Sequence, residues 1–155
     1  MKKLLNIILV VFFLVQLEVL FAQETSYYAE KNKHLKEGLS LIDQQLYAPA
    51  QLKFGRMTKA LKGVIDNDSH TLVMFANYYY ALCAAKLGQD NTELLFTRFM
   101  EAYHETTLRN RAYFELGSYY FRKNKMVNTV EWYEKVDTKE PVSYTHLTLP
   151  TRLSV

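Results

Sequence analysis

The sequence has few of the residues that cross-link a chain or turn it sharply. Among its 155 residues are one cysteine, three prolines and five glycines. Cys83 alone cannot form a disulfide within the chain or supply a multi-cysteine zinc site. Few glycines and prolines leave few turn signals for a sheet of many strands, so the composition favours helices. Because 49% of the residues are hydrophobic, the chain can still pack a core. Its length allows one modest domain, and its composition predicts that this domain is all-α.

An excess of one charge is also missing. The formal net charge is +3, but Lys2, Lys3 and Arg152 lie near the two ends of the chain. Residues 23–140 carry 16 basic against 15 acidic side chains, which is a net charge of about +1. Domains that bind nucleic acid usually have a clear basic excess, so we expect no nucleic-acid partner.

The sequence contains no motif for a catalytic, metal or cofactor site. His34, His70, His104 and His146 lack the four-residue helical spacing of a zinc site. The glycine patterns of phosphate loops, dinucleotide-binding folds and hydrolase elbows are absent as well. Cys83 lies in an apolar helical pattern without a positive neighbour, so we interpret it as a small buried residue rather than a nucleophile. We therefore expect no catalytic residue, no metal and no cofactor, in a protein that is not an enzyme.

Residues 1–22 have the three-part layout of a secretory signal peptide. Two lysines precede an apolar run over residues 4–15, and apolar and small residues at 20–22 end the segment. The run is shorter than the roughly 20 apolar residues that span a bilayer. The alternatives are a retained membrane anchor and a buried helix. The layout predicts export and a mature chain that starts near Gln23.

The middle of the chain has the spacing of helical hairpins. Apolar residues recur three and four apart from about residue 26 onward, as on one face of a helix. Gly88 and Asn124 lie where helices are expected to end. The spacing predicts six helices that pair into antiparallel hairpins. These hairpins are expected at about 26–65, 69–104 and 107–137, within a helical repeat domain of residues 23–140.

The third hairpin carries a repeat pattern. Its residues occupy, in one register, the aromatic, leucine-glycine, tyrosine, small, aromatic and proline positions of a 34-residue helical repeat. They are Tyr113, Leu116, Gly117, Tyr120, Thr129, Tyr133 and Pro141. In this pattern the chain resembles the tetratricopeptide-repeat (TPR) family. Gly117 is expected to let the two helices approach closely, while tyrosine and threonine side chains at 120, 129 and 133 fill the seam.

The first two hairpins resemble the pattern less closely. Four residues of the first hairpin keep the mutual offsets of their counterparts in the third: Gly38, Leu41, Ala50 and Phe54. In the second hairpin Ala81 replaces the glycine, and Leu95 with Phe99 fit only if the loop is two residues longer. Three repeats are the usual minimum for a self-supporting stack. The predicted fold is therefore all-α, with antiparallel helix hairpins stacked as a short TPR-like α-solenoid of about three hairpins.

Three consecutive tyrosines, Tyr78, Tyr79 and Tyr80, suggest a stacking platform at first sight. Neighbouring residues on a helix point about 100° apart, so three in a row cannot form one platform. At least one of these tyrosines is therefore expected to face the core.

The resemblance implies partner binding. Tetratricopeptide proteins bind an extended peptide or a partner's helix in a concave groove lined by the first helix of each hairpin. Carried over by register, the protein-binding face would include Phe75, Tyr78, Leu82, Arg111, Phe114, Ser118 and Phe121, after Asn32, Leu35 and Leu39 of the first hairpin. This face is mostly apolar and aromatic, so an apolar segment of a protein or peptide is the expected ligand. The alternative is that further repeats cover these residues.

The end of the chain departs from the helical pattern. Residues 143–151 read SYTHLTLPT, which resembles translated sequencing-adapter sequence rather than a repeat. We therefore expect residues 141–155 to be a non-native or disordered tail, and the chain to be an N-terminal fragment.

With its signal-peptide layout and its repeats rich in tyrosine, asparagine and lysine, the chain resembles exported tetratricopeptide proteins of the Bacteroidota. This resemblance implies a non-catalytic scaffold for protein–protein interaction, secreted across the inner membrane and located in the periplasm or at the outer membrane. Membrane contact is expected only through the signal segment or a partner. The alternative is an N-terminal targeting or interaction module of a larger enzyme or surface protein.

Overall fold

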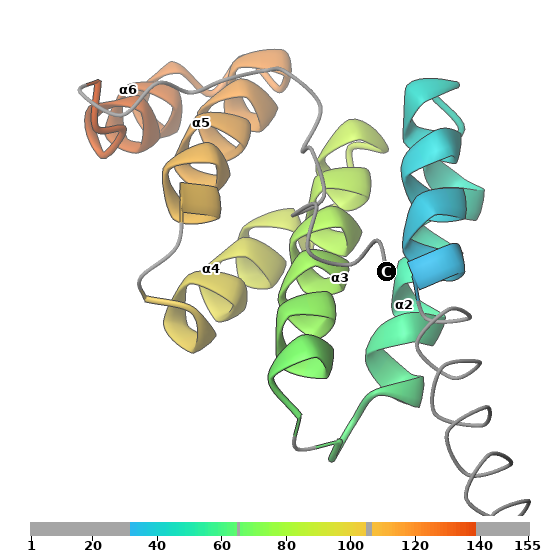
Figure 1. Ribbon diagram of the computed structural model, residues 1–155. Coiled ribbons are helices and arrows are strands. Elements are labelled where there is room, and N and C mark those ends of the chain that lie inside the picture. Colours follow the sequence, from blue (N-terminus) through green and yellow to red (C-terminus); the bar gives the residue numbers. More distant parts are fainter. Residues whose placement is uncertain (1–31, 65, 105–106, 139–155) are drawn as a thin grey trace, which may run out of the picture. The chain divides into compact units, whose positions relative to one another are not determined.

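The computed structural model describes residues 32–64, 66–104 and 107–138, which form helices and no strand. The predicted all-α class is confirmed. A first helix is described over residues 32–43. The helices that follow are α2 (Tyr47–Ala60), α3 (Asn67–Lys86), α4 (Thr92–Ala102), α5 (Thr107–Arg122) and α6 (Met126–Glu134) (Figure 1). The predicted signal peptide, residues 1–22, and the predicted tail, residues 141–155, lie outside the described residues and stay predictions.

The chain divides into two compact units, Met1–Leu87 and Gly88–Val155. Unit 1 contains the helix of residues 32–43, α2 and α3, and unit 2 contains α4, α5 and α6. The division falls inside the second predicted hairpin, residues 69–104. That hairpin and a single repeat domain over residues 23–140 therefore stay predictions, whereas the first and third hairpins each lie within one unit.

In unit 1, helix α2 packs against both of the other helices. Lys53 on α2 forms an ion pair with Glu37 on the first helix, with 2.6 Å between Nζ and Oε2. Phe54, also on α2, lies against Gly38 of the first helix. Helix α2 also packs along α3 (Figure 1), where the rings of Phe54 and Tyr79 stack with their centroids 5.3 Å apart. The core of unit 1 therefore forms around Phe54, which is fully buried.

Helix α3 begins with a capped turn and is buried along much of its length. The Asp66 carboxylate accepts hydrogen bonds from the backbone N–H and the hydroxyl of Ser69, both at 2.6 Å, which satisfies a backbone donor at the helix N-terminus. Tyr78 and Tyr79 are buried, and Tyr80 lies against Gly55 of α2. The prediction that at least one of the three tyrosines faces the core is confirmed.

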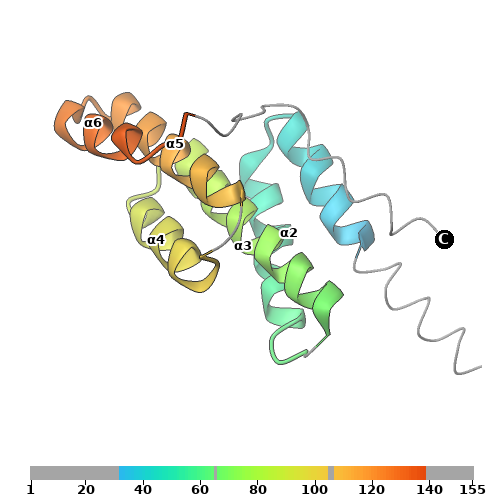
Figure 2. The same ribbon diagram turned by 60° about the vertical axis from the view of Figure 1, so that its left-hand side comes forward.

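In unit 2, helix α5 packs along α6 and also contacts α4 (Figure 1 and Figure 2). Tyr120 of α5 donates a hydrogen bond to the Glu93 carboxylate at the start of α4. The side-chain amide of Asn110 donates to the Asp137 carbonyl at 2.9 Å, and its oxygen accepts from the Asp137 N–H at 2.7 Å. Both Tyr120 and Asn110 are buried. Hydrogen bonds from buried side chains thus tie α5 to the start of α4 and to the residues after α6.

Candidate partner-binding surfaces

The turn that ends the first helix of unit 1 has a counterpart in unit 2. Gln45, after the helix of residues 32–43, has a φ of 59°, and Asn124, after α5, has a φ of 56°. Left-handed backbone is uncommon for residues other than glycine. The two residues are 79 positions apart, the offset that also separates Gly38 from Gly117. The helix that starts each hairpin therefore ends in the same conformation.

The hydrogen bonds of the two turns match as well. The Leu46 N–H donates to the Leu41 carbonyl at 2.8 Å, and the Lys125 N–H donates to the Tyr120 carbonyl at 3.0 Å. A bond of this span closes a helix whose following residue is left-handed. The preceding backbone hydrogen bond also matches. The Gln45 N–H donates to the Ile42 carbonyl at 2.8 Å, and the Asn124 N–H donates to the Phe121 carbonyl at 3.0 Å. The two turns therefore have the same local structure.

A glycine in each hairpin lies against an aromatic ring 16 residues later. A Cβ atom built on Gly38 would stand 2.6 Å from Cζ of Phe54, and one built on Gly117 would overlap the ring of Tyr133. A side chain fits at either position only if the ring moves. The close helix approach predicted at Gly117 is confirmed, and the same contact occurs in the first hairpin.

The two rings differ in how far they are covered. Phe54 is fully buried, whereas Tyr133 exposes 37% of its surface. The Tyr133 ring lies beside Phe114, with 5.5 Å between the centroids, and its hydroxyl oxygen is 3.1 Å from Oγ of Ser118. Tyr133 therefore fills the seam between α5 and α6, as predicted, but it also reaches the surface.

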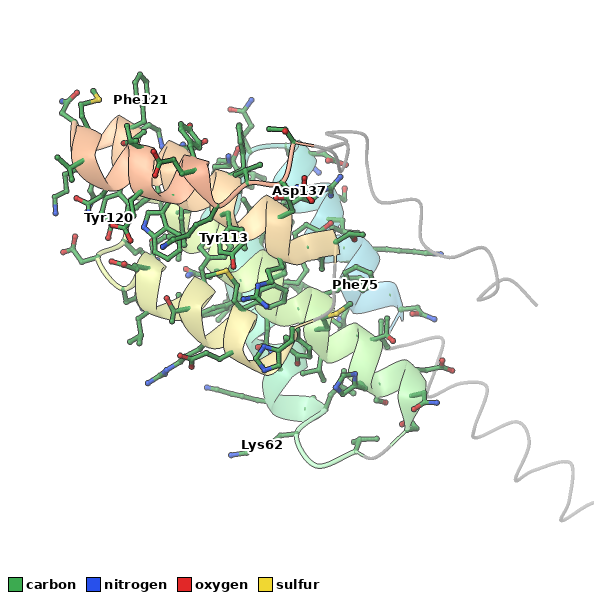
Figure 3. The ribbon with its side chains drawn as sticks, turned by 90° about the vertical axis from the view of Figure 1, so that its left-hand side faces the viewer. Lys62, Phe75, Tyr113, Tyr120, Phe121 and Asp137 are labelled. Atoms are coloured by element: carbon green, nitrogen blue, oxygen red, sulfur yellow. The ribbon has the colours of Figure 1, made fainter. Side chains whose placement is uncertain are left out.

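Four of the predicted partner-binding residues lie along one side of α5. Arg111, Phe114 and Ser118 are partly exposed, and Phe121 exposes 56% of its surface. Their spacing of three and four residues places them on one helix face, and Phe121 projects from the end of α5 (Figure 3). We call these four residues the α5 face.

The other three predicted residues lie on α3 in unit 1 and are less accessible. Phe75 is partly exposed, but Tyr78 and Leu82 are buried. A buried side chain offers no surface to a ligand, so α3 contributes only Phe75 of the three as a contact. Because α3 and α5 belong to different units, a common groove formed by all seven residues stays a prediction.

A second apolar surface lies on α6 and was not among the predicted binding residues. Its exposed members are Met126, Val127, Val130 and Tyr133. They share one side of the helix, whereas Thr129 and Trp132 on the other side are buried. We call the four exposed residues the α6 face. A signal for it exists in the sequence, since apolar residues occur on both sides of α6, but the resemblance directs attention to the first helix of each hairpin.

Charged groups near these faces pair with one another. Lys123 lies 2.6 Å from Asp90 and stands over the Tyr119 ring, 4.9 Å from its centroid. The hydrogen bond from Lys123 holds the pKa of the Asp90 carboxyl below its ordinary value. Lys135 stands over the ring of Trp132 at 3.8 Å. The exposed apolar side chains of the two faces are those of Phe121 on α5 and of Met126, Val127, Val130 and Tyr133 on α6.

Few of the described side chains could bind a metal ion or act as a nucleophile. They contain no group of three or more His, Cys, Asp or Glu side chains that could hold a metal ion. Burial raises the pKa of the Cys83 thiol to about 12, so the nucleophilic thiolate is scarcely populated at neutral pH. None of the described helices is both long and apolar enough to cross a membrane.

In comparisons with known proteins, no family model matches the chain, and no curated protein and no solved structure matches it. Function is therefore inferred from the α5 and α6 faces and from the residues that form them.

Proposed function

We propose that the chain is a non-catalytic scaffold of the tetratricopeptide type that binds an apolar segment of a protein partner at the α5 face. The exposure of Phe121, on the same side of α5 as the partly exposed Phe114, carries the proposal. Contiguous exposed apolar side chains mark interaction sites, and aromatic residues are enriched in their centres. Arg111, at the other end of this face, offers a guanidinium to a carboxylate of the bound segment.

The repeat assignment is supported by backbone geometry. The first and third hairpins share their turn conformation and their contact between a glycine and an aromatic ring. Gly88 is left-handed as well, with a φ of 71°. It follows Ala81 by seven residues, which is the spacing between Gly38 and Gln45. A third repeat in the same register accounts for this agreement.

We place this scaffold in the cell envelope of a bacterium. The proposal is supported by the signal-peptide layout of residues 1–22, with two lysines before an apolar run and small and apolar residues at its end. After export, a scaffold with apolar faces would act through protein contacts in the periplasm or at the outer membrane.

A peptide selection tests the proposed binding. The purified 155-residue chain is immobilised, a displayed library of random peptides is selected on it, and the affinities of enriched peptides are measured by fluorescence anisotropy. We expect apolar peptides whose affinity falls by at least about tenfold in Phe121→Glu, because a central aromatic contact contributes most in a small interface. The matched control is Leu52→Glu on α2, which is exposed to the same extent at 57% and should change the affinity less than about twofold.

Two outcomes contradict the proposal. One is a selection that enriches no peptide for the wild-type chain. The other is a set of peptides that bind Phe121→Glu as tightly as the wild type. Circular dichroism of both variants verifies that their helices are intact.

A further inference from the structure

Helix α6 is apolar on two sides, and only one of them is fully buried. Thr129 and Trp132 are buried, whereas Val130 exposes 55% of its surface and Val127 more. A helix that carries apolar residues on both sides normally lies between two neighbours. Among the described residues of unit 2, α6 has one packed neighbour, α5.

The equivalent helix of unit 1 has both neighbours. Helix α2 contacts the first helix through Gly38 and Phe54 and packs along α3. Tyr79 of α3 stacks on Phe54 with 23° between the ring planes. At the next position of each helix, Tyr80 lies against Gly55, where an added Cβ atom would stand 3.0 Å from the tyrosine ring. Unit 1 therefore shows which kind of element covers this side of the hairpin.

Adding the offset of 79 residues identifies the equivalent positions of this interface in unit 2. Tyr133 takes the place of Phe54, and Val130 takes the place of Gln51. We propose that the α6 face binds an amphipathic helix of a partner protein, with an aromatic side chain that stacks on Tyr133 as Tyr79 stacks on Phe54. This inference concerns a neighbouring surface, which adjoins the α5 face where Tyr133 contacts Phe114 and Ser118, and another kind of ligand. It does not depend on peptide binding at the α5 face.

One difference between the two hairpins indicates which residue should follow the aromatic residue in the partner helix. The place of Gly55 is taken by Glu134, which is exposed. A tyrosine in the position of Tyr80 would meet the Glu134 side chain there, whereas a lysine or arginine would pair with its carboxylate. The partner helix should therefore carry an aromatic residue followed directly by a basic or small one.

Among the described residues, a second copy of this chain offers no other helix with an aromatic residue at the position of Tyr79. Tyr79 itself is buried in unit 1. In the same register, its position is taken by Lys36 in the first helix and by Glu115 in α5. Neither side chain supplies a ring for Tyr133, so a second copy bound through either helix would not provide the stacking contact.

Peptides based on α3 are the probe. The 20-residue peptide 67–86, with Cys83→Ser to prevent oxidation, is labelled and titrated with the purified full chain in an anisotropy assay. We expect saturable binding, about tenfold weaker for the peptide with Tyr79→Ala because the ring stacking is lost. The peptide with Tyr80→Lys should bind about two- to threefold more tightly, and Glu134→Gln in the protein should remove this gain.

Variants of the protein locate the binding site. Val130→Glu, at an exposed position that does not affect the core, should weaken the peptide by at least about tenfold. Leu52→Glu on α2 and Phe121→Glu on the α5 face should each change the affinity less than about threefold. Loss of binding in Phe121→Glu but not in Val130→Glu would assign the peptide to the α5 face and overturn the proposal.

Three further results would also overturn it. The first is no saturable binding of any α3 peptide. The second is undiminished binding to Val130→Glu, as expected if the peptide displaces α3 from unit 1. The third is a sedimentation profile in which the chain self-associates and Val130→Glu makes it monomeric, because the α6 face would then bind a second copy.

Discussion

The first and third hairpins are built from the same local structure, but their outer sides differ. In both hairpins a glycine admits an aromatic ring 16 residues later and a left-handed residue ends the first helix. In unit 1 that ring, Phe54, is sealed by α3, whereas in unit 2 the equivalent Tyr133 is partly exposed. Short-range sequence thus determines the shape of a hairpin, and a neighbouring helix determines which of its residues become core. This difference can be tested by making the same substitution in both hairpins.

The largest effect is expected at the two rings. Phe54→Ala removes a fully buried side chain and leaves a cavity, so we expect it to lower the free energy of unfolding by about 3–5 kcal/mol. Tyr133→Ala removes a ring that is already partly in water, and about 1–2 kcal/mol is expected. Urea denaturation followed by circular dichroism measures the first value. Fluorescence of Trp132, the single tryptophan of the sequence, reports the second from within unit 2.

Equal losses at the two rings would contradict the comparison. They would mean that Tyr133 is covered as completely as Phe54 when the protein is in solution.

A smaller effect is expected at the two glycines. In Gly38→Ala the new methyl group meets the ring of Phe54, which is fully buried, so we expect a loss of about 2 kcal/mol from overpacking. In Gly117→Ala the ring of Tyr133 can turn toward solvent at the cost of its contact with Ser118. Alanine also favours the helix by up to about 1 kcal/mol. The net loss at Gly117 should therefore stay below about 1 kcal/mol, measured by the same two signals.

The smallest effect is expected at the two left-handed residues. Gln45→Gly relieves an unfavourable conformation and should raise the free energy of unfolding by up to about 1 kcal/mol. Asn124→Gly should gain only a few tenths of a kcal/mol, since asparagine tolerates this conformation better. Thermal unfolding of both variants measures the difference. A loss of stability in Gln45→Gly would show that its side chain contributes more than its backbone costs.

The sequence predicted the parts of the fold that depend on short-range pattern. The helical class, the close approach at Gly117 and a turn at Asn124 follow from apolar periodicity and from the preferences of glycine and asparagine. The left-handed Gln45 was not predicted, because glutamine has no special preference for that conformation. Its position becomes evident only when the first hairpin is aligned with the third.

The candidate site was predicted less completely, because burial depends on which helices are neighbours. Tyr78 and Leu82 have the helical spacing expected of residues that line the predicted groove, but both are buried. Tyr133 was expected to fill the seam between two helices, and Val130 was not considered. Both belong to the exposed α6 face. A pattern of apolar residues shows that a side of a helix is covered by something, but not whether the cover belongs to the same chain.

The burial of Cys83 affects how readily the chain would be oxidised outside the cytoplasm. It is the single cysteine of the sequence, it is fully buried, and its pKa is raised to about 12. In an oxidising compartment an accessible unpaired thiol would join two molecules through a disulfide. Here oxidation requires that unit 1 first open, so the rate at which an added thiol reagent labels Cys83 measures how often that opening occurs.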